Sequence, residues 1–268
     1  MYALLLAPYF GYRFEHTVEG TYQIVVAALE LFGALNVLLL GVVRFRRPWA
    51  PSTPSVPHVA RAASGDAGGG GSGPYDVAVL VPCYSEPDEM IINTVRAALA
   101  LGSPLASRVR VCLLDDAGRP SRAEALAALA PPTKALYVSR PKDPMVPRHG
   151  KAGNLNWCLR NVLYPGGGMP GADAVIIVLD CDMEAHSDFL AQTLPHLAEE
   201  SSIALVQTPQ FFYNVAPAGD IFNHHNLFFY QAMQPGLDAW GATFCCGTNF
   251  AARASALYEV GLQLTRPN

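Results

Sequence analysis

The protein has 268 residues, of which 51% are hydrophobic and 15% are charged. Its net charge of −4 and isoelectric point near 5.9 give no overall positive field, which argues against nucleic acid as a partner. The length is sufficient for a complete α/β core. Because the hydrophobic content exceeds that of a typical soluble domain, we expect part of the chain to lie in lipid.

A transmembrane helix is predicted at residues 22–47, after an N-terminal segment at residues 1–21. The stretch Ile24–Val43 is apolar apart from Glu30 and Asn36, and about 20 such residues are enough to cross the core of a bilayer. The alternative is a buried helix of a soluble protein, which the charge of Glu30 favours. The N-terminal segment is too short to span, and either the tail of an earlier helix or a segment at the membrane surface would account for it.

Three arginines follow the apolar stretch closely: Arg44, Arg46 and Arg47. Positive residues collect on the cytosolic side of membrane helices, so this end and everything after it are expected in the cytosol. The sequence thus predicts an integral membrane protein with a cytosolic domain, in either the plasma membrane or the Golgi. Residues 48–74 are rich in Pro, Ser, Ala and Gly and are predicted to be a flexible linker.

From residue 75 to residue 268, strand signals alternate with helix signals. Strands are expected at Asp76–Val81, Arg108–Leu114, Lys134–Ser139, Ala174–Leu179 and Ile203–Gln207, and helices near Asp88–Leu101, Ser121–Ala130, Gly153–Leu163 and Ser187–Glu200. Repeated strand–helix units predict an α/β fold with a doubly wound, mostly parallel sheet. Binding residues of such a sheet gather at the carboxyl ends of its strands.

Two aspartates follow the fourth predicted strand directly, as Asp180-Cys181-Asp182. Their i, i+2 spacing on an extended chain aims both carboxylates the same way, into the crevice at the sheet edge. Two hard oxygen donors there suit Mg²⁺ or Mn²⁺, with the remaining ligands taken from a diphosphate and water. Aspartates at strand ends also form turns and helix caps, but in this context they predict a nucleotide-sugar site.

The first and second strands end in polar groups at the same edge. Tyr84 and Glu86 follow the first strand, and Asp115 and Asp116 follow the second. The Tyr84 ring could cover a nucleobase, while a carboxylate of Asp115 or Asp116 can accept hydrogen bonds from a base N–H or from ribose hydroxyls. A simple turn at the second strand end is the alternative.

A basic, proline-rich segment, residues 140–156, connects the third strand to the following helix. It places Lys151 near the start of that helix, where backbone N–H groups already favour anions. A phosphate is therefore the expected ligand, and the alternative is a solvated charged loop.

Six sequence blocks occur in order between residue 76 and the C-terminus. They are Val81–Pro87, Asp115–Asp116, His149–Asn154, Asp180–Asp182, Gln207–Asn214 and Phe244–Asn249. In this order they resemble the catalytic domain of cellulose synthase and its relatives among family 2 glycosyltransferases. Residues 228–249 resemble the bacterial cellulose synthases in particular, including an amphipathic interface helix. The resemblance implies a GT-A fold.

The resemblance further implies that UDP-glucose is bound and that its sugar is transferred with inversion to a growing β-glucan. It assigns the metal and diphosphate to Asp180 and Asp182, the diphosphate also to Lys151, and the uridine to Asp115 and the loop of Tyr84 and Glu86. On the acceptor side it implies Gln207, Thr208, Pro209, Gln210, Phe244, Cys246, Gly247 and Thr248. The implied partners are a UDP-sugar, a polysaccharide acceptor, the membrane and other subunits of a synthase complex.

The sequence departs from this family after its last block. Members carry a Thr-Glu-Asp triplet, whose aspartate is the general base, and then a Gln-x-x-Arg-Trp motif, and neither occurs before Asn268. We therefore expect a fragment that binds the donor but carries no catalytic base of its own. Two alternatives remain: a family 2 enzyme that makes mannan, chitin, hyaluronan or a glycolipid, and a non-catalytic membrane protein that keeps the nucleotide-sugar-binding fold.

Overall fold

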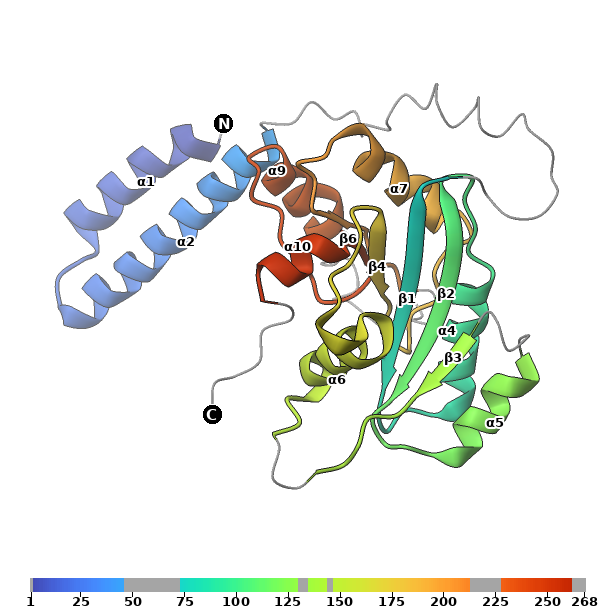
Figure 1. The fold of residues 1–268 in the computed structure, drawn as a ribbon. Helices are drawn as coiled ribbons and strands as arrows, with labels where there is room; N and C mark the ends of the chain where they lie inside the picture. Colours follow the sequence, from blue (N-terminus) through green and yellow to red (C-terminus); the bar gives the residue numbers. More distant parts are fainter. Residues whose placement is uncertain (1, 46–72, 130–134, 144–146, 213–227, 262–268) are drawn as a thin grey trace. The chain divides into compact units, whose positions relative to one another are not determined.

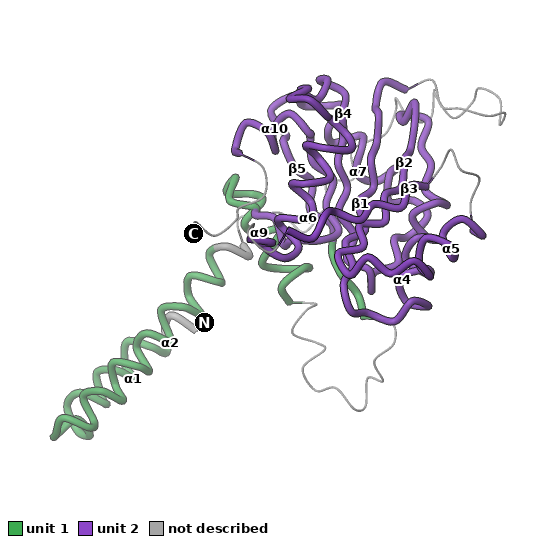
Figure 2. The backbone as a smooth tube through the Cα atoms, turned by 60° about the horizontal axis from the view of Figure 1, so that its bottom comes forward, with its two compact units in different colours: residues 1–51, 209–243 green, residues 52–208, 244–268 purple. Residues whose placement is uncertain are grey.

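The computed structural model describes residues 2–45, 73–129, 135–143, 147–212 and 228–261. Contacts within the chain divide it into two compact units, shown in two colours in Figure 2. The first unit comprises Met1–Pro51 and Pro209–Thr243, and the second comprises Ser52–Thr208 and Phe244–Asn268.

Two long helices, α1 (Tyr2–His16) and α2 (Thr21–Phe45), form most of the first unit. Arg13 of α1 forms an ion pair with Glu30 of α2, with its Nε 3.1 Å from Oε2 and its Nη2 3.3 Å from Oε1. The Tyr9 hydroxyl also donates to Glu30, over 3.2 Å. Glu30, which interrupts the apolar stretch of the sequence, is therefore neutralised by the neighbouring helix.

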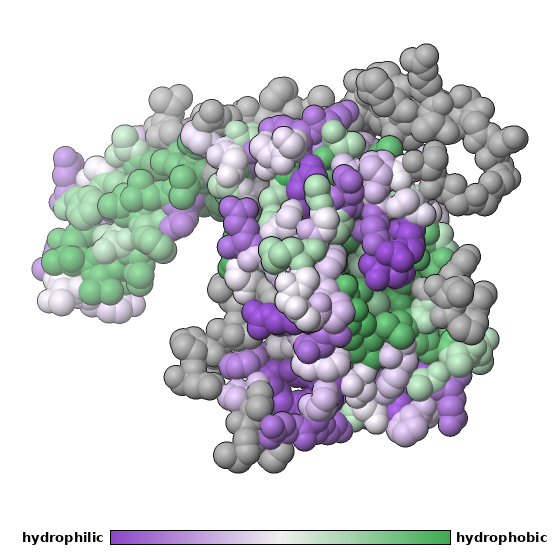
Figure 3. All heavy atoms as spheres, viewed as in Figure 1, coloured by the Kyte–Doolittle hydropathy of each residue, from purple (hydrophilic) through white to green (hydrophobic). Residues whose placement is uncertain are grey.

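Helix α2 is long and apolar enough to cross a membrane at Thr21–Val42, with a mean hydropathy of 2.2 and only 11% of this span buried. In Figure 3 the side chains of α1 and α2 form a largely hydrophobic surface. A π-helix at Phe229–Met233 and α9 (Gln234–Asp238) pack against α2. The described helix covers most of the predicted range of 22–47, while Arg46, Arg47 and nearly all of the predicted linker lie outside the described residues.

A six-stranded sheet in the order β3-β2-β1-β4-β6-β5 is the centre of the second unit (Figure 1). Its strands are β1 (Tyr75–Cys83), β2 (Ala106–Asp115), β3 (Ala135–Val138), β4 (Ala174–Val178), β5 (Leu205–Gln207) and β6 (Phe250–Arg253). Strands β3, β2, β1 and β4 run parallel, whereas β6 is antiparallel to both β4 and β5. The predicted mostly parallel α/β sheet is confirmed.

Helices cover both faces of this sheet. One face packs against α4 (Asp88–Leu99), α5 (Pro120–Leu129) and α7 (Phe189–Glu199). The other packs against α6 (Gly150–Cys158), the π-helix Leu159–Leu163 and α10 (Ala254–Glu259), and a 3₁₀ turn lies at Pro165–Gly167. The result is the three-layer arrangement expected of a doubly wound fold.

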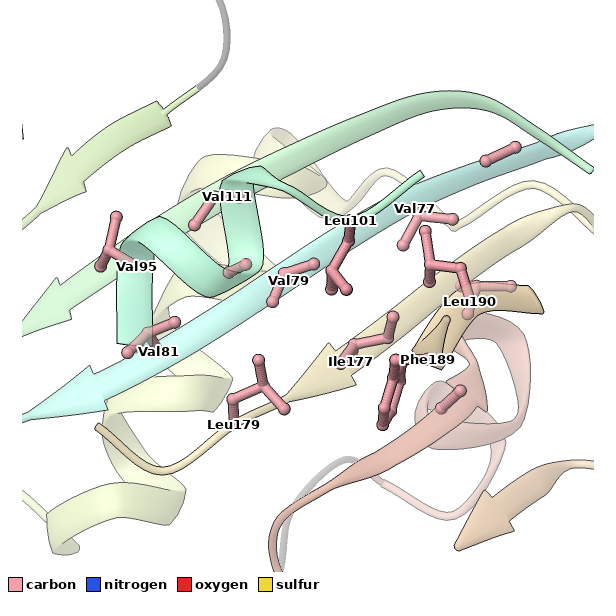
Figure 4. Close-up of a cluster of buried hydrophobic side chains, with 14 of the residues drawn as sticks. Val77, Val79, Val81, Val95, Leu101, Val111, Ile177, Leu179, Phe189 and Leu190 are labelled. Carbon is pink, nitrogen blue, oxygen red and sulfur yellow. The ribbon is translucent and has the colours of Figure 1, made fainter. Parts of the chain in front are cut away.

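The side chains of β1 point alternately to the two faces of the sheet and so contribute to both hydrophobic cores. Val77, Val79 and Val81 point into the core beneath α4 and α7, drawn in Figure 4. Ala78 and Leu80 point to the opposite face, toward α6. Successive side chains of a strand face opposite sides, and each fully buried aliphatic side chain stabilises the fold by about 1.5–3 kcal/mol.

Strand β6 was not predicted from the sequence, and it changes the arrangement of the sheet beyond β4. It lies between β4 and β5, so β5 pairs with β6 and forms the sheet edge. Its four residues, Phe-Ala-Ala-Arg, include two alanines, which are depleted in strands, so local sequence provides little strand signal. Helix α6 also begins at Gly150 rather than at the predicted Gly153, which places Lys151 in its first turn.

We predict that Ile177→Ala destabilises the protein because Ile177 of β4 is completely buried in the core beneath α4 and α7. The lost contacts and the cavity left behind should lower the free energy of unfolding by about 2–5 kcal/mol. Urea unfolding of the full chain followed by circular dichroism measures this change. The control is Leu136→Ala on β3, where the side chain is 46% exposed and a change well below that of Ile177→Ala is expected.

Candidate functional site

The carboxyl ends of β1, β2 and β4 surround an open cavity of about 540 Å³ in the second unit. Residues on its wall include Tyr84 and Glu86 after β1, Asp116 after β2, Lys151 on α6, and Asp180 and Asp182 after β4. A second opening of about 360 Å³ shares Tyr84, Asp116 and Arg148 with the first. Polar groups that are far apart in the sequence meet here because parallel strands end at the same edge of the sheet.

The two aspartates after β4 and the lysine of α6 form one end of the cavity. The Lys151 ammonium forms an ion pair with Asp180 Oδ1 and donates to the carbonyl oxygen of Gly247, over 2.7 Å. The backbone N–H of Asp180 donates to Thr248 Oγ1, over 2.7 Å. The Lys151 and Asp180 side chains are each 36% exposed, and Asp182 is exposed too. This end of the cavity therefore presents a cation and two carboxylates to solvent.

An unusual backbone turn leads into α6. His149 and Gly150 both have a φ of 52°, in the left-handed region, and His149 makes no side-chain cap. A Cβ added to Gly153 would lie 2.0 Å from the carbonyl oxygen of Arg148. Only glycine permits this approach, so Gly153 lets the basic loop fold back on the first turn of α6, beside Lys151.

Asp116 is held by two arginines of the basic loop. Arg140 donates from Nε and Nη2 to the two carboxylate oxygens, over 2.6 and 2.8 Å, and Arg148 donates to Oδ1 and, over 3.0 Å, to the backbone carbonyl. Burial opposes ionisation of this carboxyl, but the arginines outweigh it and hold the pKa of Asp116 below its usual range. Asp116 is thus a fixed anion in the wall of the cavity.

Asp115, by contrast, is completely buried and does not line the cavity. Its carboxylate accepts hydrogen bonds from Arg122 and from the Tyr137 hydroxyl, each over 2.8 Å, and from the backbone N–H of Arg119, over 2.7 Å. Burial raises its pKa, but these donors prevail and lower it overall. The sequence resemblance assigned Asp115 to the uridine, whereas in this geometry it is Asp116 that faces the cavity.

Arg122 was missed by the sequence analysis. It is fully buried and donates to the carbonyl oxygens of Tyr84 and Glu86, over 3.1 and 2.8 Å, as well as to Asp88 Oδ1, over 2.8 Å. It therefore fixes the loop after β1 that carries two predicted site residues. The one available signal was that Arg122 lies four residues before Leu126, the other buried residue of α5.

Glu86 and Tyr84 are tied to each other within this loop. Glu86 Oε2 accepts the backbone N–H of Tyr84, over 2.6 Å. Burial opposes ionisation of Glu86, but this hydrogen bond helps to hold its pKa below the usual range. The Tyr84 ring itself is 60% exposed at the mouth of both openings, where a flat ligand can lie against it.

Among the residues predicted for the acceptor side, Gln207 and Thr208 form hydrogen bonds with the loop that contains Cys246 and Thr248. Gln207 donates from Nε2 to the carbonyl oxygens of Thr248 and Asn249, over 3.0 and 3.2 Å, and accepts the backbone N–H of Cys246 over 2.8 Å. Thr208 Oγ1 donates to the same Asn249 carbonyl, over 2.8 Å. Gln207 thus holds the loop of residues 244–249, hereafter the 244–249 loop.

The remaining members of this predicted set are Phe244 and Gly247 of the loop itself, and Pro209 and Gln210 outside it. Pro209 and Gln210 belong to the first unit, and Phe244 is 50% exposed. Gly247 and Asn249 have φ values of 86° and 55°, in the left-handed region that glycine and asparagine tolerate best. The role of these residues toward an acceptor stays a prediction.

The chemistry of the cavity fits a divalent cation that arrives with a diphosphate. Within the described ranges there is no group of three or more His, Cys, Asp and Glu side chains able to hold a metal by themselves. Asp180 and Asp182 supply two carboxylates, and Mg²⁺ commonly uses one or two carboxylates together with substrate phosphates and water. The ion pair between the Lys151 ammonium and Asp180 shows that a cation is favourable at this position.

Comparison with known families gives the family of the chain. The family model described as glycosyl transferase family 2 matches residues 78–261, which include every wall residue of the cavity named above. The chain belongs to glycosyl transferase family 2. This family assignment agrees with the position of the cavity at the carboxyl ends of three parallel strands.

Cellulose synthases are among the similar curated proteins, which confirms the resemblance seen in the sequence. Cellulose synthase 1 of Komagataeibacter xylinus is 35% identical over 191 residues, covering 69% of this chain and 11% of that protein. The UDP-forming cellulose synthase catalytic subunit of Xanthomonas axonopodis pv. citri is 31% identical over 192 residues, covering 69% of this chain and 24% of that protein. The chain therefore spans less than a quarter of the length of these relatives.

One solved structure has a similar fold. The mannosyltransferase PcManGT of Pyrobaculum calidifontis, determined with GDP-Man and Mn²⁺, aligns with 89% of this chain and 57% of its own, at 18% identity and a TM-score of 0.54. At this identity the similarity concerns the fold alone. It confirms the GT-A-type α/β fold that the sequence predicted.

We predict that Arg122→Met destabilises the protein by about 3–5 kcal/mol, because it leaves the buried Asp115 charge without its main partner. Urea unfolding of the full chain checks this value. Arg96→Met is the matched control, since Arg96 of α4 is exposed and bonds only to nearby Asn93 among its described hydrogen-bond partners. Equal stability of the two variants would contradict the central role of Arg122.

We predict that the stabilisation provided by Asp116 depends on pH. The folded-state pKa of Asp116 is lowered, so its charge favours the folded state above the unfolded-state pKa of about 3.9, and this contribution is lost as pH falls through the lowered pKa. The destabilisation caused by Asp116→Asn should therefore be largest at pH 7 and shrink below about pH 4.

Urea unfolding of wild type and variant across pH 3–7 measures this dependence. Asp173→Asn serves as the control because Asp173 is exposed and precedes β4, at the end of that strand opposite to Asp180. An effect of Asp116→Asn that stays constant over the whole pH range would show that the ion pairs with Arg140 and Arg148 do not stabilise the fold.

Proposed function

We propose that this chain is the donor-binding part of a membrane-bound, inverting glycosyltransferase of the cellulose synthase type. It would bind UDP-glucose and pass the glucose to the end of a growing β-glucan. The observation that carries this proposal is the cavity itself, where a lysine, two carboxylates after β4 and a fixed carboxylate after β2 meet at one sheet edge. The similarity to cellulose synthases over 69% of the chain supports the choice of polymer and donor.

Within this proposal the two ends of the cavity have different tasks. Asp180 and Asp182 would hold Mg²⁺ or Mn²⁺, and Lys151 would neutralise the diphosphate. Tyr84, with its exposed ring, and Asp116 would bind the nucleoside. Asp115 would act indirectly, since its carboxylate is occupied by protein donors.

Inverting transfer requires that the leaving diphosphate be stabilised while an acceptor hydroxyl attacks the sugar from the opposite face. When bound, the divalent ion supplies positive charge to that leaving group. The Lys151 ammonium adds a second positive charge in the same place. Among the described residues we assign none as the general base.

The proposal also assigns α2 to the membrane, with the sheet domain on the cytosolic side. Its 22-residue apolar span and low burial support this assignment, as do the arginines that follow it in the sequence. The ion pair of Arg13 with Glu30 satisfies the charge within the span. A polysaccharide acceptor, and the partner subunits of a synthase, would be met by the full-length protein.

We predict that Asp182→Ala abolishes metal-dependent binding of UDP and UDP-glucose, because a two-carboxylate site then keeps a single ligand. Calorimetric titration of the full chain with Mn²⁺, and again with a chelator, measures this binding. Asp173→Ala removes the same kind of side chain at the other end of β4 and should leave the affinity unchanged. Binding of UDP that is equally strong with chelator, or that survives in Asp182→Ala, would refute the proposed site.

A further inference from the structure

We propose that the Lys151 ammonium competes with a divalent metal ion for the Asp180 carboxylate and is displaced from it when metal binds. Without metal, this ammonium neutralises Asp180 and ties α6 to the 244–249 loop through the carbonyl oxygen of Gly247. With metal on Asp180, the lysine is freed for the diphosphate and the loop is released. This inference rests on the proposed function, because it concerns the same site.

Exposure of both partners distinguishes this ion pair from the others around the cavity. Asp115 and Arg122 are completely buried, Asp116 and Arg140 are nearly so, and Arg148, which is 35% exposed, pairs with the same nearly buried Asp116. Breaking such pairs leaves a charge in a medium of low polarity, which is costly. The Lys151 and Asp180 side chains are each 36% exposed, so water can solvate both when they separate. This pair can therefore exchange partners, whereas the buried pairs are permanent parts of the wall.

The charges favour exchange when a divalent ion is present. A single ammonium faces Asp180, while the exposed Asp182 lies two residues further along the chain in the same cavity wall. A doubly charged ion between two carboxylates gains more electrostatic energy than one ammonium on one carboxylate. The displaced lysine has a flexible four-carbon stem and can follow the incoming diphosphate.

The contact with Gly247 connects this exchange to the neighbouring loop. The 244–249 loop is held on one side by Gln207 and Thr208, through their bonds to Thr248 and Asn249. On the cavity side, Lys151 donates to the Gly247 carbonyl. Gly247 has a φ of 86° and a Cβ at this position would meet nothing within 4 Å, so no neighbouring atom packs against this side of the residue.

The first test is a titration of Mn²⁺ alone, without nucleotide, into the full chain, followed by the magnetic resonance signal of free Mn²⁺. Lys151→Met removes the competing ammonium and should tighten Mn²⁺ binding about tenfold. The same variant should weaken binding of UDP in the presence of Mn²⁺, because the diphosphate loses a cation. Opposite changes in the two affinities are the signature of exchange.

Lys142→Met is the matched control. It removes an equal charge from the neighbouring opening, where Lys142 donates to the carbonyl oxygen of Ala117 and not to Asp180. Its effect on Mn²⁺ affinity should stay below about twofold, since Lys142 makes no ion pair with Asp180 among the described residues, and salt at about 0.1 M screens exposed charges that lie more than about 10 Å apart. Equal effects of the two variants would mean that general charge, not contact with Asp180, sets the affinity, and would overturn the proposal.

The second test measures the 244–249 loop by hydrogen exchange and mass spectrometry. In the wild type, Mn²⁺ should raise exchange at the Cys246 and Gly247 amides several-fold. In Lys151→Met and in Asp180→Asn, exchange should be raised already without metal and should not respond to it. Unchanged exchange in the wild type on adding saturating Mn²⁺ would overturn the coupling, even if one variant proved unstable.

Failure of this inference is distinguishable from failure of the proposed function. If the wild type binds UDP with Mn²⁺ but Lys151→Met binds Mn²⁺ alone no more tightly than the wild type, the exchange is wrong and the donor site remains. If the wild type binds neither UDP nor UDP-glucose in any condition, the proposed function itself fails, and the exchange proposal fails with it.

Discussion

The buried ion pair of Arg122 with Asp115 is the interaction on which the edge of the sheet depends. An arginine with no exposed surface needs several acceptors, and here they are the carboxylates of Asp115 and Asp88 and the two carbonyls of the loop after β1. One side chain from α5 thereby joins the ends of β1 and β2 to the start of α4. A wall built this way is rigid before any ligand binds, which lowers the entropic cost of recognition.

The cavity separates charges that serve the fold from charges left for a ligand. Asp115 and Asp116 are paired with arginines, whose planar guanidinium groups match carboxylates and remain weakly hydrated when buried. At the other end, Asp180 is paired with a lysine, a strongly hydrated point charge on a flexible stem. The two ends differ in the burial of their carboxylates: Asp115 and Asp116 are at most 10% exposed, whereas Asp180 is 36% exposed.

Sequence patterns were sufficient for the parallel strands and for most of the cavity, because both depend on local signals. The apolar run Ala174–Leu179 predicts a buried strand, and the two aspartates that follow it are predicted at the carboxyl end of that strand. Arg122 was not predictable in this way, since its acceptors come from residues 84–88 and 115 and exist only in the folded chain. The different roles of Asp115 and Asp116 were hidden for the same reason: neighbouring residues of an extended chain point to opposite sides, and only packing decides which side is solvent.

Strand β6 explains how the 244–249 loop reaches Lys151 and Asp180, two residues that line the cavity. Parallel strands bring the residues that follow them to the carboxyl edge, whereas an antiparallel strand brings the residues that precede it. Phe250 pairs with Val178, and the Asn249 N–H donates to the Val178 carbonyl over 2.7 Å. Gly247 must then lie beside Asp180, within reach of Lys151. The link between the 244–249 loop and the end of the cavity at Asp180 is therefore a consequence of strand direction, and a parallel strand in this place would have put the loop at the opposite edge.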